Sequence, residues 1–162
     1  MAQPEIIDIS SELRLRRYDG NFAIFLRGYS DPYVYKNSEG ITDPANAPDL
    51  NYVEGMCKYL SEAGELYYIE VLEDGVFIPI GDVTVKAENP PIAIWFEKYR
   101  SRGIGFAVMS TVIRRLSELG VTKITGSTIY KWNTPSQKLH ERLGFVKVGE
   151  SEDEFIYSLD IK

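Results

Sequence analysis

Two glycines and two arginines stand together in the stretch "RSRGIGF", residues 100–106, directly before an amphipathic run over 104–120. The first turn of a helix leaves backbone N–H groups unpaired, with the positive end of the helix dipole behind them. Glycine at positions 103 and 105 removes Cβ atoms, so an anion can approach that backbone. The stretch predicts a phosphate-binding turn. A plain helix start with solvated arginines is the alternative that this pattern alone leaves open.

The two common nucleotide-binding motifs are absent from this stretch. A P-loop requires GxxxxGK[ST], and the third glycine of a dinucleotide fingerprint is replaced by Val108. A Rossmann domain also needs an acidic residue at the end of the next strand, and the strand expected over 122–130 carries none.

The single histidine of the chain, His140, lies on a predicted helix over 134–144. It shares the inner stripe of that helix with Ser136, Leu139 and Leu143. An imidazole with a pKa of about 6.5 is partly protonated at neutral pH and can donate a proton. A packed core histidine is the alternative interpretation.

Three carboxylates are candidates for a general base, namely Glu70, Asp82 and Glu97, each near the end of a predicted strand. Each is also explained as a solvated strand residue.

Aromatic residues precede a polar segment over 36–51 that shows no periodicity and is predicted to be a loop. A long loop in a compact domain is typically functional or disordered. Tyr29, Tyr33 and Tyr35 are therefore candidates for the wall of a substrate pocket, with simple packing as the alternative.

Composition narrows the class of protein. The chain has 162 residues, 44% hydrophobic, and a net charge of −6, which favours one domain over residues 1–162 and disfavours nucleic-acid binding. One cysteine and one histidine exclude an intrachain disulfide and a histidine-rich metal site. No apolar run is long enough for a membrane span, so we expect a cytoplasmic protein without membrane contact.

The elements that must position these residues follow from periodicity and turn signals. The order is strand, two helices, three strands, helix, strand, helix and two strands, which predicts an α/β (α+β) fold. The expected strands cover 11–18, 66–73, 76–86, 90–96, 122–130, 145–150 and 155–161, and the expected helices cover 19–31, 52–64, 104–120 and 134–144.

Two segments together resemble the GNAT superfamily of acyl-CoA-dependent N-acetyltransferases, and most closely its RimJ/RimL-type branch. The family signature Q/R-x-x-G-x-G/A and a second motif that follows the next strand are matched in this chain by Arg100, Gly103 and Gly105, and then by Asn133, Ser136, Gly144 and Phe145. The resemblance implies the GNAT fold, a mixed and mostly antiparallel central sheet of about seven strands flanked by about four helices.

The resemblance also implies a binding mode for acetyl-CoA. The backbone amides from Arg102 through Gly103, Ile104, Gly105 and Phe106 would hold the pyrophosphate, beside Arg100. The strand 90–96 would splay from its neighbour and offer the amides of Ala93 and Trp95 to the pantetheine arm and the acyl oxygen, and Asn133 would contact the pantetheine region.

The chain departs from the family where the usual proton donor is a tyrosine, because His140 occupies that position. His140 is therefore the expected donor to the departing thiolate, followed by Ser136 and then Tyr130. Deprotonation of the amine through water is common in the family.

The expected function is transfer of an acetyl group from acetyl-CoA, without a metal, to a primary amine by direct attack on the thioester. The expected partner is a small-molecule amine or a peptide N-terminus, with Tyr29, Tyr33 and Glu70 as acceptor-binding candidates, and a homodimer is left open. A non-catalytic CoA-binding or protein-interaction module and a structural domain without a cofactor are the alternatives.

Overall fold

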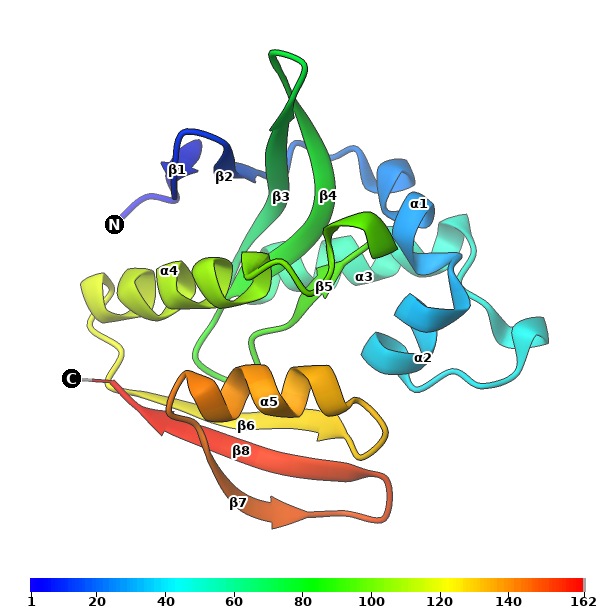
Figure 1. The fold of residues 1–162 in the computed structure, drawn as a ribbon, viewed down its shortest axis with the longest axis vertical. Helices are drawn as coiled ribbons and strands as arrows, with labels where there is room; N and C mark the ends of the chain where they lie inside the picture. Colours follow the sequence, from blue (N-terminus) through cyan, green and yellow to red (C-terminus); the bar gives the residue numbers. More distant parts are fainter. Residues whose placement is uncertain (162) are drawn as a thin grey trace.

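The computed structural model describes residues 1–161, which contain eight strands and five α-helices (Figure 1). The strands are β1 (Ile6–Asp8), β2 (Leu13–Arg17), β3 (Glu65–Glu73), β4 (Val76–Val85), β5 (Ile92–Ile94), β6 (Lys123–Tyr130), β7 (Val146–Glu150) and β8 (Glu154–Asp160). The α-helices are α1 (Leu26–Tyr29), α2 (Pro32–Glu39), α3 (Leu50–Ala63), α4 (Ile104–Glu118) and α5 (Thr134–Arg142), and 3-10 turns cover Phe22–Phe25, Pro44–Asn46 and Glu97–Tyr99.

The strands form two antiparallel sheets, with the orders β1-β2-β3-β4-β5 and β6-β8-β7. The long hairpin of β3 and β4 turns at Asp74 and Gly75, as their sequence predicts, and both have positive φ. The register between β3 and β4 shifts where Glu70 pairs with Pro79, because proline has no N–H to donate to the hydrogen bonds between the strands. The expected layered α/β fold is confirmed, but the sheet is divided and has one strand more than expected.

The two sheets are joined at one end and diverge toward the other. A single parallel bridge pairs Glu88 with Thr125, and the amide of Asn89 donates to the Thr125 carbonyl at 2.8 Å. Beyond this bridge, β5 and β6 are the facing edges of separate sheets. The opening between these two strands is where a ligand can reach the backbone of β5.

Two hydrophobic cores hold the layers together. Helix α4 contributes Val108, Met109 and Val112 to the larger core, whose sheet residues include Ile69 on β3. The smaller core lies on the opposite face of the five-stranded sheet, between β3 and helices α1 and α3, around Phe25. Helices α4 and α3 therefore cover opposite faces of the five-stranded sheet, and Figure 1 shows the nearer α4 and the fainter, more distant α3.

The segment before α3 differs from the prediction. The helix expected over 19–31 is a 3-10 turn followed by one turn of α1, and the Asp31 side chain caps a new helix by accepting from the Tyr33 amide. Proline at the first position of α2 and Gly40 in the left-handed region at its end complete a standard helix signature. The predicted loop over 36–51 is therefore partly helical.

Within residues 1–161, none of the helices is long and apolar enough to cross a membrane.

Candidate active site

Two neighbouring cavities form the candidate site, and the larger of them, about 650 Å³, lies between the first turns of α4 and α5 and the free edge of β5. It is lined by Tyr33, Val34, Asn37, Ser38, Ile92, Ala93, Ile94, Tyr99, Arg100, Ser101, Gly103, Ile104, Gly105, Phe106, Asn133, Thr134, Pro135, Ser136, Lys138, Leu139 and Arg142. Most of the glycine stretch singled out in the sequence is thus part of its wall. Arg102 is exposed beside this wall and does not line the cavity.

The glycine stretch has the conformation that anion binding requires. Gly103 is the N-cap of α4 with φ +80°, and a Cβ added there would meet no protein atom within 4 Å. The Ala107 amide makes the first helical hydrogen bond, to the Gly103 carbonyl, so the preceding amides of the first turn have no helical acceptor. No acidic side chain lies in this turn. The site therefore offers free donors and the positive end of a 15-residue helix.

The Arg100 side chain is held in place by contacts with neighbouring residues. Its guanidinium lies 4.0 Å from the centre of the Tyr33 ring and donates to the carbonyls of Ile94 and Trp95 at 3.3 and 3.1 Å. A weaker contact of 3.5 Å reaches Asp31. Arg100 thereby connects the glycine turn to the end of β5. Tyr33 lines the larger cavity and not the smaller one.

The prediction that Ala93 and Trp95 offer free amides from β5 is wrong in register. The Trp95 amide donates to the Ile80 carbonyl at 2.8 Å, so it faces β4. Backbone groups alternate between the two sides of an antiparallel strand, so Ala93, which pairs with Asp82, also faces β4. The amides of Ile92 and Ile94 face the cavity edge instead.

The Trp95 side chain has a structural role in the smaller core. It is fully buried, and its indole N–H donates to Asp82 Oδ1 at 2.8 Å. The hydroxyl of Tyr29 donates to the same oxygen at 2.9 Å. Burial raises the pKa of the Asp82 carboxyl to about 7, and these two hydrogen bonds lower it only in part.

A second cavity of about 380 Å³ lies on the other side of the β5 edge. Its wall is made by Tyr29, Asn37, Ser38, Glu39, Met56, Tyr59, Leu60, Lys86, Asn89, Pro90, Pro91, Ile92, Ser127, Thr128, Ile129, Tyr130, Asn133, Ser136, His140 and Glu154. Five residues line both cavities, namely Asn37, Ser38, Ile92, Asn133 and Ser136. The two cavities therefore meet at these residues, beside the free edge of β5.

The smaller cavity combines carboxylates with tyrosine rings. Glu39 accepts a hydrogen bond from the Tyr52 hydroxyl, and burial raises the pKa of its carboxyl. The pKa of Tyr130 is raised by burial and by the negative charges of Glu154 and Glu39. Lys86 is a cation on this wall, and it contacts the Tyr59 hydroxyl at 3.2 Å.

The start of α5 brings three predicted site residues together. The Asn133 side chain caps the helix by accepting from the Ser136 amide at 3.4 Å. His140 lies one turn farther along, with Nδ1 2.7 Å from the Ser136 carbonyl and 3.4 Å from its hydroxyl. Burial lowers the pKa of His140, so the neutral imidazole dominates at neutral pH. This weakens the expectation that His140 protonates the departing thiolate.

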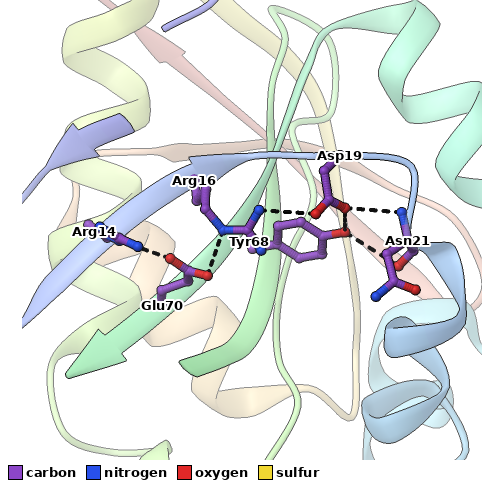
Figure 2. A network of polar contacts seen from close by, with 6 residues as sticks. All are labelled: Arg14, Arg16, Asp19, Asn21, Tyr68 and Glu70. Carbon is purple, nitrogen blue, oxygen red and sulfur yellow. Dashed lines mark hydrogen bonds and ion pairs between the residues drawn. The ribbon is translucent and has the colours of Figure 1, made fainter. Parts of the chain in front are cut away.

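The prediction that Glu70 contacts the acceptor is wrong. Its side chain lies on the α3 face of β3 and lines neither cavity. Figure 2 shows it between Arg14 and Arg16, which donate to its two oxygens at 2.9 and 2.8 Å. Only 2% of Glu70 is exposed, so this carboxylate is held in a structural ion pair. Asp19 and Tyr68 extend the same network.

Two further predictions are not supported by the cavities. Glu97 starts a 3-10 turn and lines neither cavity, and Tyr35 is buried in α2 and lines neither cavity. Tyr29 does line the smaller cavity, although its hydroxyl is directed at Asp82.

Several lining residues escaped the sequence analysis. Glu39 was assigned to the loop, although the capping signature at Asp31 and Gly40 identifies its helix. Lys138 and Arg142 of α5 were not among the candidate residues, yet they line the larger cavity. Their i, i+4 spacing beside the second motif was the available signal. The Arg142 guanidinium lies 4.2 Å from the centre of the Phe106 ring.

Comparison with known proteins agrees with this geometry. The model of the Acetyltransferase (GNAT) family matches residues 33–145, more than half of the chain. A curated relative, the SPbeta prophage-derived uncharacterized N-acetyltransferase YokL of Bacillus subtilis (strain 168), is 41% identical over 56 residues, which are 34% of this chain and 31% of YokL. The chain thus aligns with about a third of that relative's length.

Solved structures match over nearly the whole chain. A domain from Methanocaldococcus jannaschii DSM 2661 has a TM-score of 0.78 at 24% identity, covering 93% of this chain and 99% of that one. Spermidine N-acetyltransferase from Vibrio cholerae, solved with CoA and spermine, has a TM-score of 0.72 at 16% identity, covering 94% and 97%. The acetyl transferase from Salmonella typhimurium that modifies the N-terminal serine of ribosomal protein L7/L12 has a TM-score of 0.70 at 15% identity, covering 98% and 100%.

A RimL structure is also among the matches, in agreement with the expected resemblance to the RimJ/RimL-type branch. These likenesses establish the fold, and the family match covers both motifs up to Phe145. The glycine turn at the start of α4, the free edge of β5 and the second motif on α5 are the parts that this match includes. The chain belongs to the acetyltransferase (GNAT) family.

Proposed function

We propose that this protein transfers the acetyl group of acetyl-CoA to a primary amine. The observation that carries the proposal is the meeting of two cavities at the free edge of β5. The larger cavity begins at a turn with free amides and basic side chains, and the smaller one contains carboxylates and tyrosines. A thioester from one side and an amine from the other would meet at Ile92 and Ser136.

The pyrophosphate of the coenzyme is assigned to the first turn of α4. Ile104, Gly105 and Phe106 supply amides without helical acceptors, and the missing Cβ of Gly103 leaves the approach open. Lys138 and Arg142 supply further positive charge from α5 for the phosphates. The chemistry of these donors fits a polyanionic coenzyme.

The pantetheine arm is assigned to the free edge of β5. Ile92 and Ile94 take the place that the sequence analysis gave to Ala93 and Trp95, because their amides are directed away from β4. One of these amides would then donate to the acyl oxygen as negative charge develops on it. Donors of this kind commonly contribute about 3–4 kcal/mol to the transition state. Asn133 remains a proposed contact to the arm.

The amine is assigned to the smaller cavity. Glu39 attracts an ammonium group, and the rings of Tyr29, Tyr59 and Tyr130 provide faces for a cation or an alkyl chain. The Vibrio cholerae enzyme is named for spermidine and the Salmonella typhimurium enzyme for a protein N-terminus, so either acceptor class suits this fold.

Ser136 is the proposed source of a proton for the thiolate, because its residue lines both cavities at their junction. A free thiol has a pKa near ~8.5, so its thiolate leaves tolerably at neutral pH and the proton is helpful rather than obligatory. Most of the rate would come from alignment of the two reactants.

A panel of amines tests the proposal. Purified protein is incubated with acetyl-CoA and, separately, with spermidine, an amino sugar, a free amino acid or a peptide that begins with serine. Release of CoA thiol is followed together with the mass of each amine. We expect one acceptor class to be acetylated in step with thiol release. Binding of CoA without acetylation of any amine would indicate a non-catalytic CoA-binding protein. Absence of CoA binding would refute both the transferase and the non-catalytic CoA-binding protein.

A further inference from the structure

The tautomer of His140 follows from its surroundings. Nδ1 lies 2.7 Å from the backbone carbonyl oxygen of Ser136. A carbonyl oxygen only accepts hydrogen bonds, so the hydrogen of the neutral ring is on Nδ1. Nε2 then carries the lone pair. The imidazole in this state is a proton acceptor and not a donor.

The free nitrogen faces the smaller cavity. Nε2 makes no hydrogen bond with any of residues 1–161. The fully enclosed polar side-chain atoms without a partner, in the same residues, are Thr84 Oγ1 and Ser127 Oγ, so Nε2 retains access to the cavity that His140 lines. The rings of Phe145, edge-on at 4.8 Å, and Tyr157, at 6.3 Å, hold the imidazole in this orientation.

We propose that His140 is the proton acceptor of the acetyl transfer, reached through a water molecule in the smaller cavity. The inference rests on the proposed function and assigns a different role to His140 from the one that the family position implies. His140 lines the smaller cavity one helical turn from Ser136, a residue that lines both cavities.

The proton transfer balances as follows. The amine nitrogen forms a bond to the acyl carbon while one of its N–H bonds breaks. That proton passes to the water, and a proton of the water passes to Nε2, which becomes an imidazolium. The C–S bond then breaks, and the sulfur leaves with its electron pair. The imidazolium returns its proton to water in the cavity, so the neutral ring is restored.

The groups around the imidazole fix the direction of its pH dependence. On α5, Glu141 is occupied by the Tyr157 hydroxyl of β8 at 2.9 Å. Across the cavity the charged and titratable groups are Glu39 on α2, Lys86 after β4, Tyr59 on α3, Tyr29 on α1, Tyr130 on β6 and Glu154 on β8. None of these is a hydrogen-bonding partner of the ring, and burial lowers the His140 pKa. Activity should therefore rise as pH increases through a value below ~6.5.

Nuclear magnetic resonance of the imidazole tests the tautomer without any acceptor, because His140 is the only histidine of the chain. The nitrogen shifts of the ring, recorded across pH, should show the hydrogen on Nδ1 and a pKa below ~6.5. A hydrogen on Nε2, or a pKa above that value, would overturn the inference even if the protein acetylates amines.

One variant tests the catalytic role with the best amine of the panel. Asparagine at position 140 can still donate to the Ser136 carbonyl but has no basic nitrogen, so His140→Asn should lower kcat by about 10²-fold or more. Its melting temperature and CoA affinity should change little, and the acidic limb of its pH profile should disappear.

The control is Thr84→Val, because Thr84 is fully buried and lines neither cavity. Its kcat should equal that of the wild type. Unchanged kcat in His140→Asn overturns the inference and leaves the proposed function intact. Loss of kcat in His140→Asn matched by an equal loss in Thr84→Val assigns the loss to a general disturbance of the fold and also overturns the inference. If the wild type acetylates no amine, the proposed function fails, and this role for His140 fails with it.

Discussion

Replacing Gly103 with alanine separates the backbone conformation of the glycine turn before α4 from its proposed role in binding the pyrophosphate. Gly103 has φ +80°, and its added Cβ would meet no protein atom within 4 Å, so alanine introduces strain but no clash. A residue with a side chain in the left-handed region costs about 1–2 kcal/mol. For a chain of this size each kcal/mol lowers the melting temperature by about 2–4 °C. We therefore expect a decrease of about 2–8 °C.

The new methyl group would stand in the open space in front of the first-turn amides of α4. A phosphate could then no longer approach them closely, and we expect the Kd for CoA to rise at least about tenfold, equivalent to about 1.4 kcal/mol. Calorimetric titration with CoA measures this change, and thermal unfolding of the same sample measures the strain.

The control is Gly120→Ala at the other end of the same helix. Gly120 has φ +83°, and its added Cβ also meets no atom within 4 Å, so the backbone strain is the same. Gly120 lines neither cavity. The two variants should lose similar stability, but only Gly103→Ala should lose CoA affinity. Equal losses of affinity in both variants, or none in either, would refute the assignment of the pyrophosphate to this turn.

Two further predictions concern the carboxylates of Glu39 and Asp82. Glu39→Gln should raise the KM for a cationic acceptor by about tenfold, because it removes a charged partner of the ammonium group. The Kd for CoA should stay unchanged. The control is Glu70→Gln, which lies away from both cavities and should leave both constants at their wild-type values. Asp82 should make the fold less stable as pH rises from about 4 to about 7, because burial raises its pKa to about 7 and the folded state keeps a proton that the unfolded state has lost. The difference of about three pKa units corresponds to at most about 4 kcal/mol in the free energy of unfolding. Urea unfolding measured from about pH 4 to about pH 7 gives the dependence of this free energy on pH, and Asp82→Asn should abolish the dependence. An unchanged dependence in the variant would contradict the assignment.

The conformation of the glycine turn before α4 could be predicted from the sequence because it depends on local interactions. Glycines before a long amphipathic helix determine both the conformation and the free amides, and the structure has both at Gly103. The same is true of α5, whose start is set by Asn133 as a capping residue. Helix α2 was not predicted, because the aperiodic composition of 36–51 suggested a loop. The capping signature that begins at Asp31 marks the helix in the sequence.

Roles that depend on pairing between distant segments could not be predicted in this way. Glu70 is buried because Arg14 and Arg16 lie opposite it on β2, a register that no local pattern specifies. The amide direction in β5 depends on its register with β4, so Trp95 was misassigned. His140 was predicted to face inward, which is correct, but its tautomer depends on a 2.7 Å contact that periodicity does not reveal.

Acetyl-CoA with an isotopically labelled acetyl group provides the most direct test of the central claim. The label is followed by mass spectrometry in the amine, in free acetate and in the coenzyme, for the wild type and for Gly103→Ala. The account predicts that the label enters an amide of the acceptor in equal amount to the CoA thiol released, and that the variant does this only at higher coenzyme concentration. Label recovered in free acetate, or retained in acetyl-CoA with every amine of the panel, would contradict it.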